Sequence, residues 1–209
     1  MGFCTNRSKW SFRDLVEMKI AILGWGSLLW EGGGKFDEHH EPWQFDGPSL
    51  ELEFSRVSES RAGALTLVID PENGVPITVA YCLSTRSEPD DAICDLRHRE
   101  GTTRRNIGVA NLSTGTAEGW NNESCSAILT WAIEKKIDVV VWTDLGSNFH
   151  QKVGQRFSAQ SAIYYLQGLN SNGKAKAAEY VRRAPEFIKT PLRQALEGTP
   201  WFPSTSGKA

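Results

Sequence analysis

Strand-like patterns occupy the first half of this 209-residue chain, and helix-like patterns occupy the second half. The apolar run 19–23 predicts a buried strand that ends at Gly24, and the alternating run 50–54 predicts a half-buried strand. Two further runs, 64–69 and 75–83, are separated by a five-residue turn sequence, so they predict an antiparallel hairpin. Because strands precede helices instead of alternating with them, we expect an α+β fold.

A helix is predicted to begin near Ser87, because Ser87 and Asp90 form a variant of the capping box and Pro89 suits a first turn. Gly101 is expected to end this helix as a C-cap. Glu100 shares the apolar face of the helix, so its side chain is expected to point inward. Later elements are expected at 107–112 and 138–143 (strands), and at 126–136, 151–169, 175–184 and from Thr190 to Gly198 (helices).

The composition is that of an ordinary globular protein, with 40% hydrophobic and 23% charged residues. We expect a main domain at residues 18–150, an N-terminal extension at 1–17 and a helical C-terminal extension at 151–209 packed on that domain. The net charge is −2 and no dense basic run is present, so a nucleic-acid partner is not expected. No apolar run has the length of a membrane span, and residues 1–17 lack the order of a signal peptide, so no membrane partner is expected either.

The cysteines and histidines do not have metal-binding spacing. The four cysteines, at positions 4, 82, 94 and 125, form no C-x-x-C pair, which argues against a zinc site and against a disulfide scaffold. Free buried thiols are expected, and with them a cytoplasmic location. His39 and His40 lie between acidic residues, but adjacent side chains diverge, so a solvated acidic loop without metal is expected there.

The loop 24–28 follows the first predicted strand and consists of Gly24, Trp25, Gly26, Ser27 and Leu28. Two glycines flank Trp25, so successive backbone N–H groups can turn toward one point and bind an anionic group such as a carboxylate. The alternative is a tight turn that needs glycine for conformational reasons only. The phosphate-binding and dinucleotide-binding glycine patterns are both absent here.

Glu100 is the second candidate functional residue. Burial on the apolar face and the negative end of its helix would both raise its pKa, toward the range in which a carboxylate acts as a base and then as an acid. The alternative is a helix-end glutamate paired with Arg97, Arg104 or Arg105, which would lower the pKa.

Together the two segments resemble a known family. Residues 22–28 (ILGWGSL) resemble the first-strand motif of the gamma-glutamylcyclotransferases, usually Tyr-Gly-Ser-Leu after an apolar strand, and Trp30 looks more like the glutathione-degrading branch. Residues 96–101 (LRHREG) are similar to the helix end that carries the catalytic glutamate of that family. The resemblance covers about residues 19–108 and implies a mixed β-barrel or sheet with flanking helices and a helical C-terminal region.

The resemblance implies an enzyme that needs no metal or cofactor. The α-amine of a γ-glutamyl group attacks its own γ-carbonyl, which closes the five-membered ring of 5-oxoproline and releases an amine. By resemblance, the backbone of the loop 24–28 holds the glutamyl head group. Glu100 takes a proton from the ammonium and returns it to the departing nitrogen, a kind of help typically worth about 10²–10⁴-fold.

One departure from the family concerns the substrate. The tyrosine of the family motif is Trp25 here, which predicts an apolar wall that favours a sizeable or cationic tail on the leaving amine. Two other functions of the same pocket stay open. One is a non-catalytic protein that binds γ-glutamyl compounds or carboxylates, and the other is an amide hydrolase or amine transferase.

Overall fold

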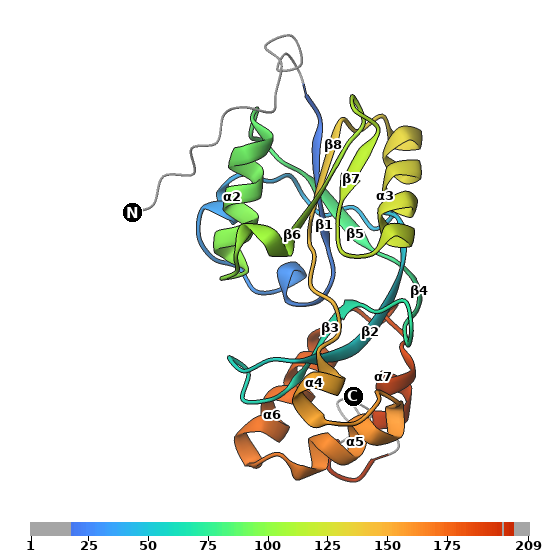
Figure 1. Cartoon of the computed structure of the whole chain (residues 1–209). Coiled ribbons are helices and arrows are strands. Elements are labelled where there is room, and N and C mark those ends of the chain that lie inside the picture. The colour runs from blue at the N-terminus through green and yellow to red at the C-terminus, as the bar shows by residue number, and fades with distance from the viewer. Residues whose placement is uncertain (1–17, 198, 203–209) are drawn as a thin grey trace. The chain divides into compact units, whose positions relative to one another are not determined.

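The computed structural model describes residues 18–197 and 199–202, which divide into two units (Figure 1). Unit 1 contains the described residues up to Ser49 together with 78–145, and unit 2 contains 50–77 together with the described residues from Gly146 onward. The sequence analysis expected an extension at 1–17, which lies outside the described residues, a main domain at 18–150 and a C-terminal extension at 151–209. The structure instead groups 50–77 with the C-terminal helices, because these segments pack on one another.

Unit 1 is built on an open five-stranded sheet in the order β5-β1-β8-β6-β7. Its strands are β1 (Ile20–Gly24), β5 (Ala80–Leu83), β6 (Ile107–Asn111), β7 (Thr116–Glu118) and β8 (Val139–Thr143). Its helices are η1 (Gly26–Leu29), α1 (Lys35–Glu38), α2 (Pro89–Arg99), η2 (Arg104–Asn106) and α3 (Asn122–Lys135). Only β1 and β8 run parallel to each other, and the remaining neighbours in this sheet are antiparallel.

The two long helices of unit 1 cover opposite faces of this sheet (Figure 1). Side chains alternate between the faces of a strand, so Ile20 and Ile22 of β1 reach the face that α2 covers, where they join Ile93 and Leu96 of the helix in one apolar cluster. The residues between these positions point to the opposite face of the sheet. The central strands read as continuous apolar runs because both of their faces are buried.

Helix α2 confirms its predicted ending and the predicted place of Pro89 in its first turn, but not the predicted cap. The N-cap is Glu88, without a side-chain capping bond, rather than Ser87. At the other end, Gly101 has a φ of 57° and its N–H donates to the carbonyl of His98 (3.1 Å). Thr102 N–H closes the turn on the carbonyl of Arg97 (3.1 Å), which completes a Schellman motif. This motif fixes Glu100 as the last residue before the chain turns away.

Unit 2 combines a three-stranded sheet with four helices. The strands are β2 (Ser49–Val57), β3 (Leu65–Ile69) and β4 (Val75–Thr78), and the helices are α4 (Phe149–Val153), α5 (Ala159–Gly168), α6 (Ser171–Arg183) and α7 (Pro191–Leu196). The predicted helix 151–169 is split in two, because Gly154 adopts φ 76° and Ser158 starts α5 with a capping box. The predicted cap of Thr190 before Pro191 is confirmed, whereas the predicted end at Gly198 lies outside the described residues.

The predicted hairpin is wrong, because the order β3-β2-β4 places β2 between its two strands. The turn itself is present: Gly74 N–H donates to the carbonyl of Asp70 (2.7 Å), and Asp70 N–H donates to Glu51 on β2 (2.9 Å). The predicted strand 75–83 is also interrupted, since Val79 bonds to Gly47 and Pro48 and its two halves join different sheets. Both sheets of the described residues are open, so the α+β class is confirmed and the expected barrel is not found.

A buried carboxylate joins the sheet of unit 2 to its last helix. Glu53 of β2 has no exposed surface, and it accepts hydrogen bonds from the N–H groups of Phe54 (2.7 Å) and Leu192 (3.1 Å). Burial raises the pKa of Glu53 above its ordinary value of 4.5, Asp70 raises it further, and hydrogen bonds from Thr190 and the two N–H groups oppose that rise. Glu53 therefore binds its proton more tightly in the folded than in the unfolded chain.

We expect the free energy of unfolding of unit 2 to fall as the pH rises from about 4.5 through the raised pKa of Glu53. The sign follows from proton binding, because the folded state holds more protons than the unfolded state in this window. Glu53→Gln cannot ionise and should lack this component. Guanidinium titrations of both proteins across this pH range would give their free energies of unfolding. The same dependence of this free energy on pH in the two proteins would contradict the expectation.

Candidate active site

The candidate site lies at one edge of the sheet in unit 1. Because β1 and β8 are parallel, their carboxyl ends meet at the same edge, which is where open sheets with parallel strands commonly bind ligands. The loop 24–28 leaves β1 at this edge. Asp144 leaves β8 beside it, and its N–H donates to the carbonyl of Asn106 (2.8 Å), which brings the segment after α2 to the same place.

Two glycines of the loop 24–28 are required by its geometry. Gly26 has a φ of 63°, a conformation that other residues rarely adopt, and a Cβ at Gly24 would lie 2.5 Å from the ring of Trp43. The loop then turns into η1. The N–H groups of Gly26 and Ser27 open this short helix and have no acceptor within it, so they are the donors of the loop that could face a ligand.

Arg99 connects this loop to the end of α2. Its Nη2 donates to the carbonyl of Ser27 (3.2 Å) and to that of Glu31. The carbonyl of Ser27 also accepts from the N–H groups of Trp30 (3.2 Å) and Glu31 (2.8 Å). The end of the loop is therefore held against the helix end by one guanidinium whose side chain is only 12% exposed.

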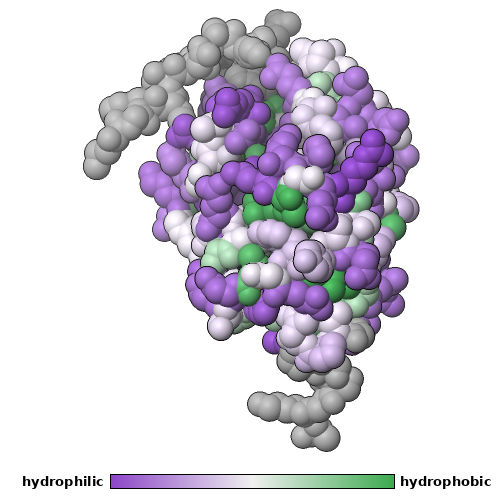
Figure 2. Space-filling model, turned by 60° about the horizontal axis from the view of Figure 1, so that its bottom comes forward, coloured by the Kyte–Doolittle hydropathy of each residue, from purple (hydrophilic) through white to green (hydrophobic). Residues whose placement is uncertain are grey.

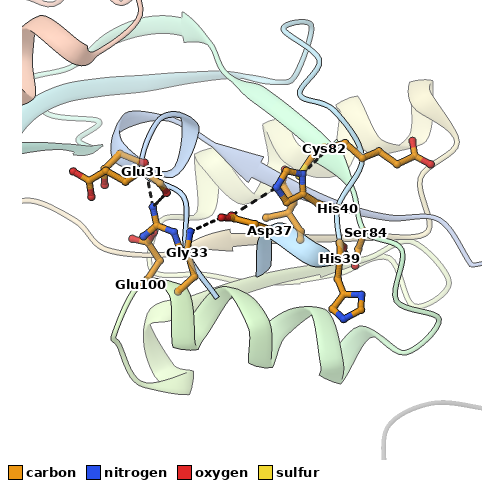
Figure 3. A network of polar contacts seen from close by, with 12 residues as sticks. Glu31, Gly33, Asp37, His39, His40, Cys82, Ser84 and Glu100 are labelled. Carbon is orange, nitrogen blue, oxygen red and sulfur yellow. Dashed lines mark hydrogen bonds and ion pairs between the residues drawn. The ribbon is translucent and has the colours of Figure 1, made fainter. Parts of the chain in front are cut away.

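Glu100 follows Arg99 and is half-buried, with 20% of its side chain exposed. Its Oε1 lies 3.8 Å from Nη1 of Arg99, and Figure 3 shows Glu100 beside Glu31 and Gly33. Two of the alternative partners named from the sequence have printed contacts elsewhere: Arg97 contacts His98 (2.8 Å), and Arg104 donates to the carbonyl of Ile107 (2.8 Å). The structure thus brings Glu100 and the loop 24–28 together, through an arginine that the sequence analysis did not single out.

A groove of about 450 Å³ lies beside this arrangement, between α2 and the loop that precedes α1. It is lined by Gly32, Gly33, Gly34, Lys35, Phe36, Asp95, His98 and Arg99. Asp95, His98 and Arg99 share one side of α2, and Arg99 is common to the groove and to the loop contact described above. The spacing of these three residues by three and four positions could have shown from the sequence that they share one side of a helix. Nothing local in the sequence indicated that a glycine loop would lie opposite them.

The histidine pair considered in the sequence analysis lies beside α1, next to Asp37, which bonds to Gly33 of the groove (Figure 3). His40 lies 4.0 Å from Asp37, and its Nδ1 lies 2.7 Å from the carbonyl of Glu41 (Figure 3). No cluster of three potential metal ligands is found within residues 18–197 and 199–202.

Two of the described cysteines are buried in the core. Cys82 and Cys125 are free and buried, as expected, and burial raises the pKa of both thiols. The pKa of Cys82 is raised the further of the two, with Glu41 adding to the effect, so this thiol stays protonated. Cys94 of α2 is disulfide-bonded, which corrects the expectation of a free thiol at that position.

Asp144 is a second carboxylate at this edge that the sequence analysis missed. It accepts hydrogen bonds from Trp142 Nε1 (2.9 Å) and from the N–H of Trp120 (2.8 Å). Burial raises its pKa, and these two hydrogen bonds oppose the rise. These two bonds tie the end of β8 to the indole of Trp142 and to the backbone of the segment that follows β7.

No protein-family model, curated protein or solved structure matches this chain. In the described part of the chain, no helix has the length and apolar character needed to cross a membrane. The side of the molecule in Figure 2 is mostly polar, with apolar residues in small separate patches.

Proposed function

We propose that this protein is a gamma-glutamylcyclotransferase-like enzyme that converts a γ-glutamyl amide into 5-oxoproline and a free amine. One observation carries the proposal. The guanidinium of Arg99 bonds to Ser27 of the loop 24–28 and lies 3.8 Å from the carboxylate of Glu100. The two segments that resemble the family are 73 residues apart between Ser27 and Glu100 (100 − 27 = 73), yet they meet at one sheet edge.

The proposed reaction uses the substrate as its own nucleophile. The N–H groups of Gly26 and Ser27 hold the carboxylate of the glutamyl head group, which places the α-amine against the γ-carbonyl. Glu100 accepts one proton from the α-ammonium, and the nitrogen attacks the γ-carbonyl carbon and gives up its second proton to solvent as the bond to the leaving nitrogen breaks. Glu100 returns its proton to that nitrogen. Intramolecular attack of this kind reaches effective molarities of about 10⁵–10⁸ M when the groups are aligned.

The test is a panel of γ-glutamyl compounds incubated with the purified protein and assayed for 5-oxoproline. Release of 5-oxoproline and an equal amount of amine supports the proposal. Saturable binding without turnover would instead identify a binding protein, and free glutamate would identify an amide hydrolase. Either of those results overturns the proposed reaction while leaving the site in place.

Trp25 is proposed to shape the choice of leaving group. Its side chain is half-buried in the loop 24–28, so part of a wide aromatic face remains available to a substrate. We expect Trp25→Tyr to lower the kcat/KM for γ-glutamyl compounds with sizeable apolar tails, relative to the kcat/KM for γ-glutamyl-alanine, by about tenfold. Trp120→Tyr changes an exposed tryptophan of the same unit and is the control. If wild type and Trp25→Tyr rank the panel identically, Trp25 only packs under the loop.

A further inference from the structure

We propose that His40 is a pH-sensitive switch for the loop 31–34, whose three glycines line the groove beside Arg99. In its protonated form, His40 pairs with Asp37 and thereby fixes the carboxylate that holds Gly33. In its neutral form, His40 gives that carboxylate no support. The switch concerns the loop alone, so it goes beyond the proposed function and does not depend on it.

His40 occupies a confined position, which corrects the solvated loop expected from the sequence. Its side chain is only 16% exposed. Its ring packs against two aromatic rings, with centroid distances of 4.8 Å to Phe36 and 5.5 Å to Trp43. The backbone beside it is held as well, because the N–H of Glu41 donates to the carbonyl of Leu83 on β5 (2.8 Å). The imidazole is therefore kept in one orientation by its surroundings.

The contact at Nδ1 decides what the other ring nitrogen presents to Asp37 (Figure 3). Nδ1 lies 2.7 Å from the carbonyl oxygen of Glu41, and a carbonyl only accepts, so Nδ1 carries a proton in both charge states. In the neutral ring Nε2 is then an acceptor, and it faces Oδ1 of Asp37 at 4.0 Å. Two acceptors in this position do not attract each other. Protonation makes Nε2 a charged donor, which converts the contact into an ion pair.

The other titratable groups of this segment, of β5 and of α2 with the residues before it are Glu38, His39, Glu41, Cys82, Arg86 and Asp95. Burial raises the pKa of the Cys82 thiol, which therefore stays uncharged. Arg86 is paired with Asp95 at 2.8 Å and also attracts Glu38. Asp37 is the carboxylate at ion-pair distance from His40, so the charge of His40 acts on Asp37.

Asp37 transmits this change to the loop through its second oxygen. Oδ2 accepts the hydrogen bond of the Gly33 N–H, while Oδ1 faces His40, so one orientation of the carboxylate serves both contacts. The loop is also held at Glu31, whose carbonyl accepts from Arg99. Within the described residues, a Cβ added at Gly33 would meet nothing within 4 Å, so the loop borders open space there. Fixing the carboxylate of Asp37 therefore fixes the part of the loop that faces the groove.

The test is hydrogen exchange at the Gly33 amide, followed by NMR between pH 5 and pH 8 and divided by the intrinsic exchange rate at each pH. We expect the protection of Gly33 to be about threefold higher at pH 5 than at pH 8, the size expected of a partly exposed ion pair. The sign follows from the charge, because the ion pair is present when His40 is protonated and is lost as the pH rises. The ring proton shifts of His40 should follow the same curve.

Two variants keep this test independent of folding defects. His40→Phe keeps an aromatic ring in the cluster but cannot be charged, and Asp37→Asn keeps an acceptor for the Gly33 N–H but cannot form the ion pair. The pH dependence at Gly33 should disappear in both variants and remain in His39→Gln, which changes the neighbouring histidine. Its persistence in either variant, or its absence from wild type, would overturn the switch. No turnover is measured, so either outcome leaves the proposed reaction to its own test.

Discussion

Glu100→Gln is expected to lower kcat/KM on any accepted γ-glutamyl substrate by about 10²–10⁴-fold, which is the usual contribution of a positioned acid–base group. The amide keeps the shape of the side chain and removes the base. Binding should be retained, because the head group is held by the backbone of the loop 24–28. Loss of the partly exposed ion pair with Arg99 should change the free energy of unfolding by only about 0–1 kcal/mol.

The matched control for that experiment is Glu134→Gln, which removes an exposed carboxylate from α3 in the same unit. It should retain wild-type turnover. Steady-state kinetics and a binding titration would be measured for all three proteins, with thermal unfolding as the check on folding. Turnover by Glu100→Gln within threefold of wild type would show that another group moves the protons.

Gly108→Val is expected to destabilise unit 1 by about 3 kcal/mol or more, the upper end of the cost of overfilling a packed core. Gly108 on β6 faces Trp142 on β8, and a Cβ at Gly108 would lie 2.1 Å from the indole ring. Trp142 has no exposed surface and its Nε1 donates to Asp144, so the ring has no room to move aside. The glycine is needed because the indole lies directly over its backbone.

The control for Gly108→Val is Gly168→Ala at the end of α5, where an added Cβ meets nothing within 4 Å. This change should stabilise by at most about 1 kcal/mol, the difference in helix propensity. Guanidinium titration followed by tryptophan fluorescence measures both variants. A free energy of unfolding for Gly108→Val within 1 kcal/mol of wild type would mean that Trp142 can adopt another position.

Local patterns in the sequence predicted most elements, since their causes are local. The apolar run before Gly24 is β1, and the Gly101 C-cap is found where backbone geometry requires a glycine. The predicted hairpin was wrong because the order of strands in a sheet depends on pairing between segments that are distant in the sequence. No local signal shows that β2 inserts between β3 and β4, or that β1 pairs in parallel with β8 from 119 residues away (139 − 20 = 119).

The residues of the candidate site were likewise predictable from the sequence only where the signal was local. The loop 24–28 and Glu100 were selected from the sequence, where residue types and family resemblance gave a signal. Arg99 was missed, although it adjoins Glu100, because its contact with Ser27 spans 72 residues of chain. The groove was equally hard to predict, since it brings residues 32–36 against Asp95, His98 and Arg99 of α2, about 60 residues further along the chain.

The most direct measurement is turnover of a γ-glutamyl substrate in water enriched in ¹⁸O, with the products identified by mass spectrometry. Cyclisation breaks the amide bond by attack of the α-amine, so the 5-oxoproline keeps the original carbonyl oxygen. We predict 5-oxoproline without ¹⁸O, one amine released per ring formed, and formation of the same product by Glu100→Gln slowed by about 10²–10⁴-fold. Glutamate labelled with ¹⁸O in its γ-carboxylate would show that water is the nucleophile and would contradict the account.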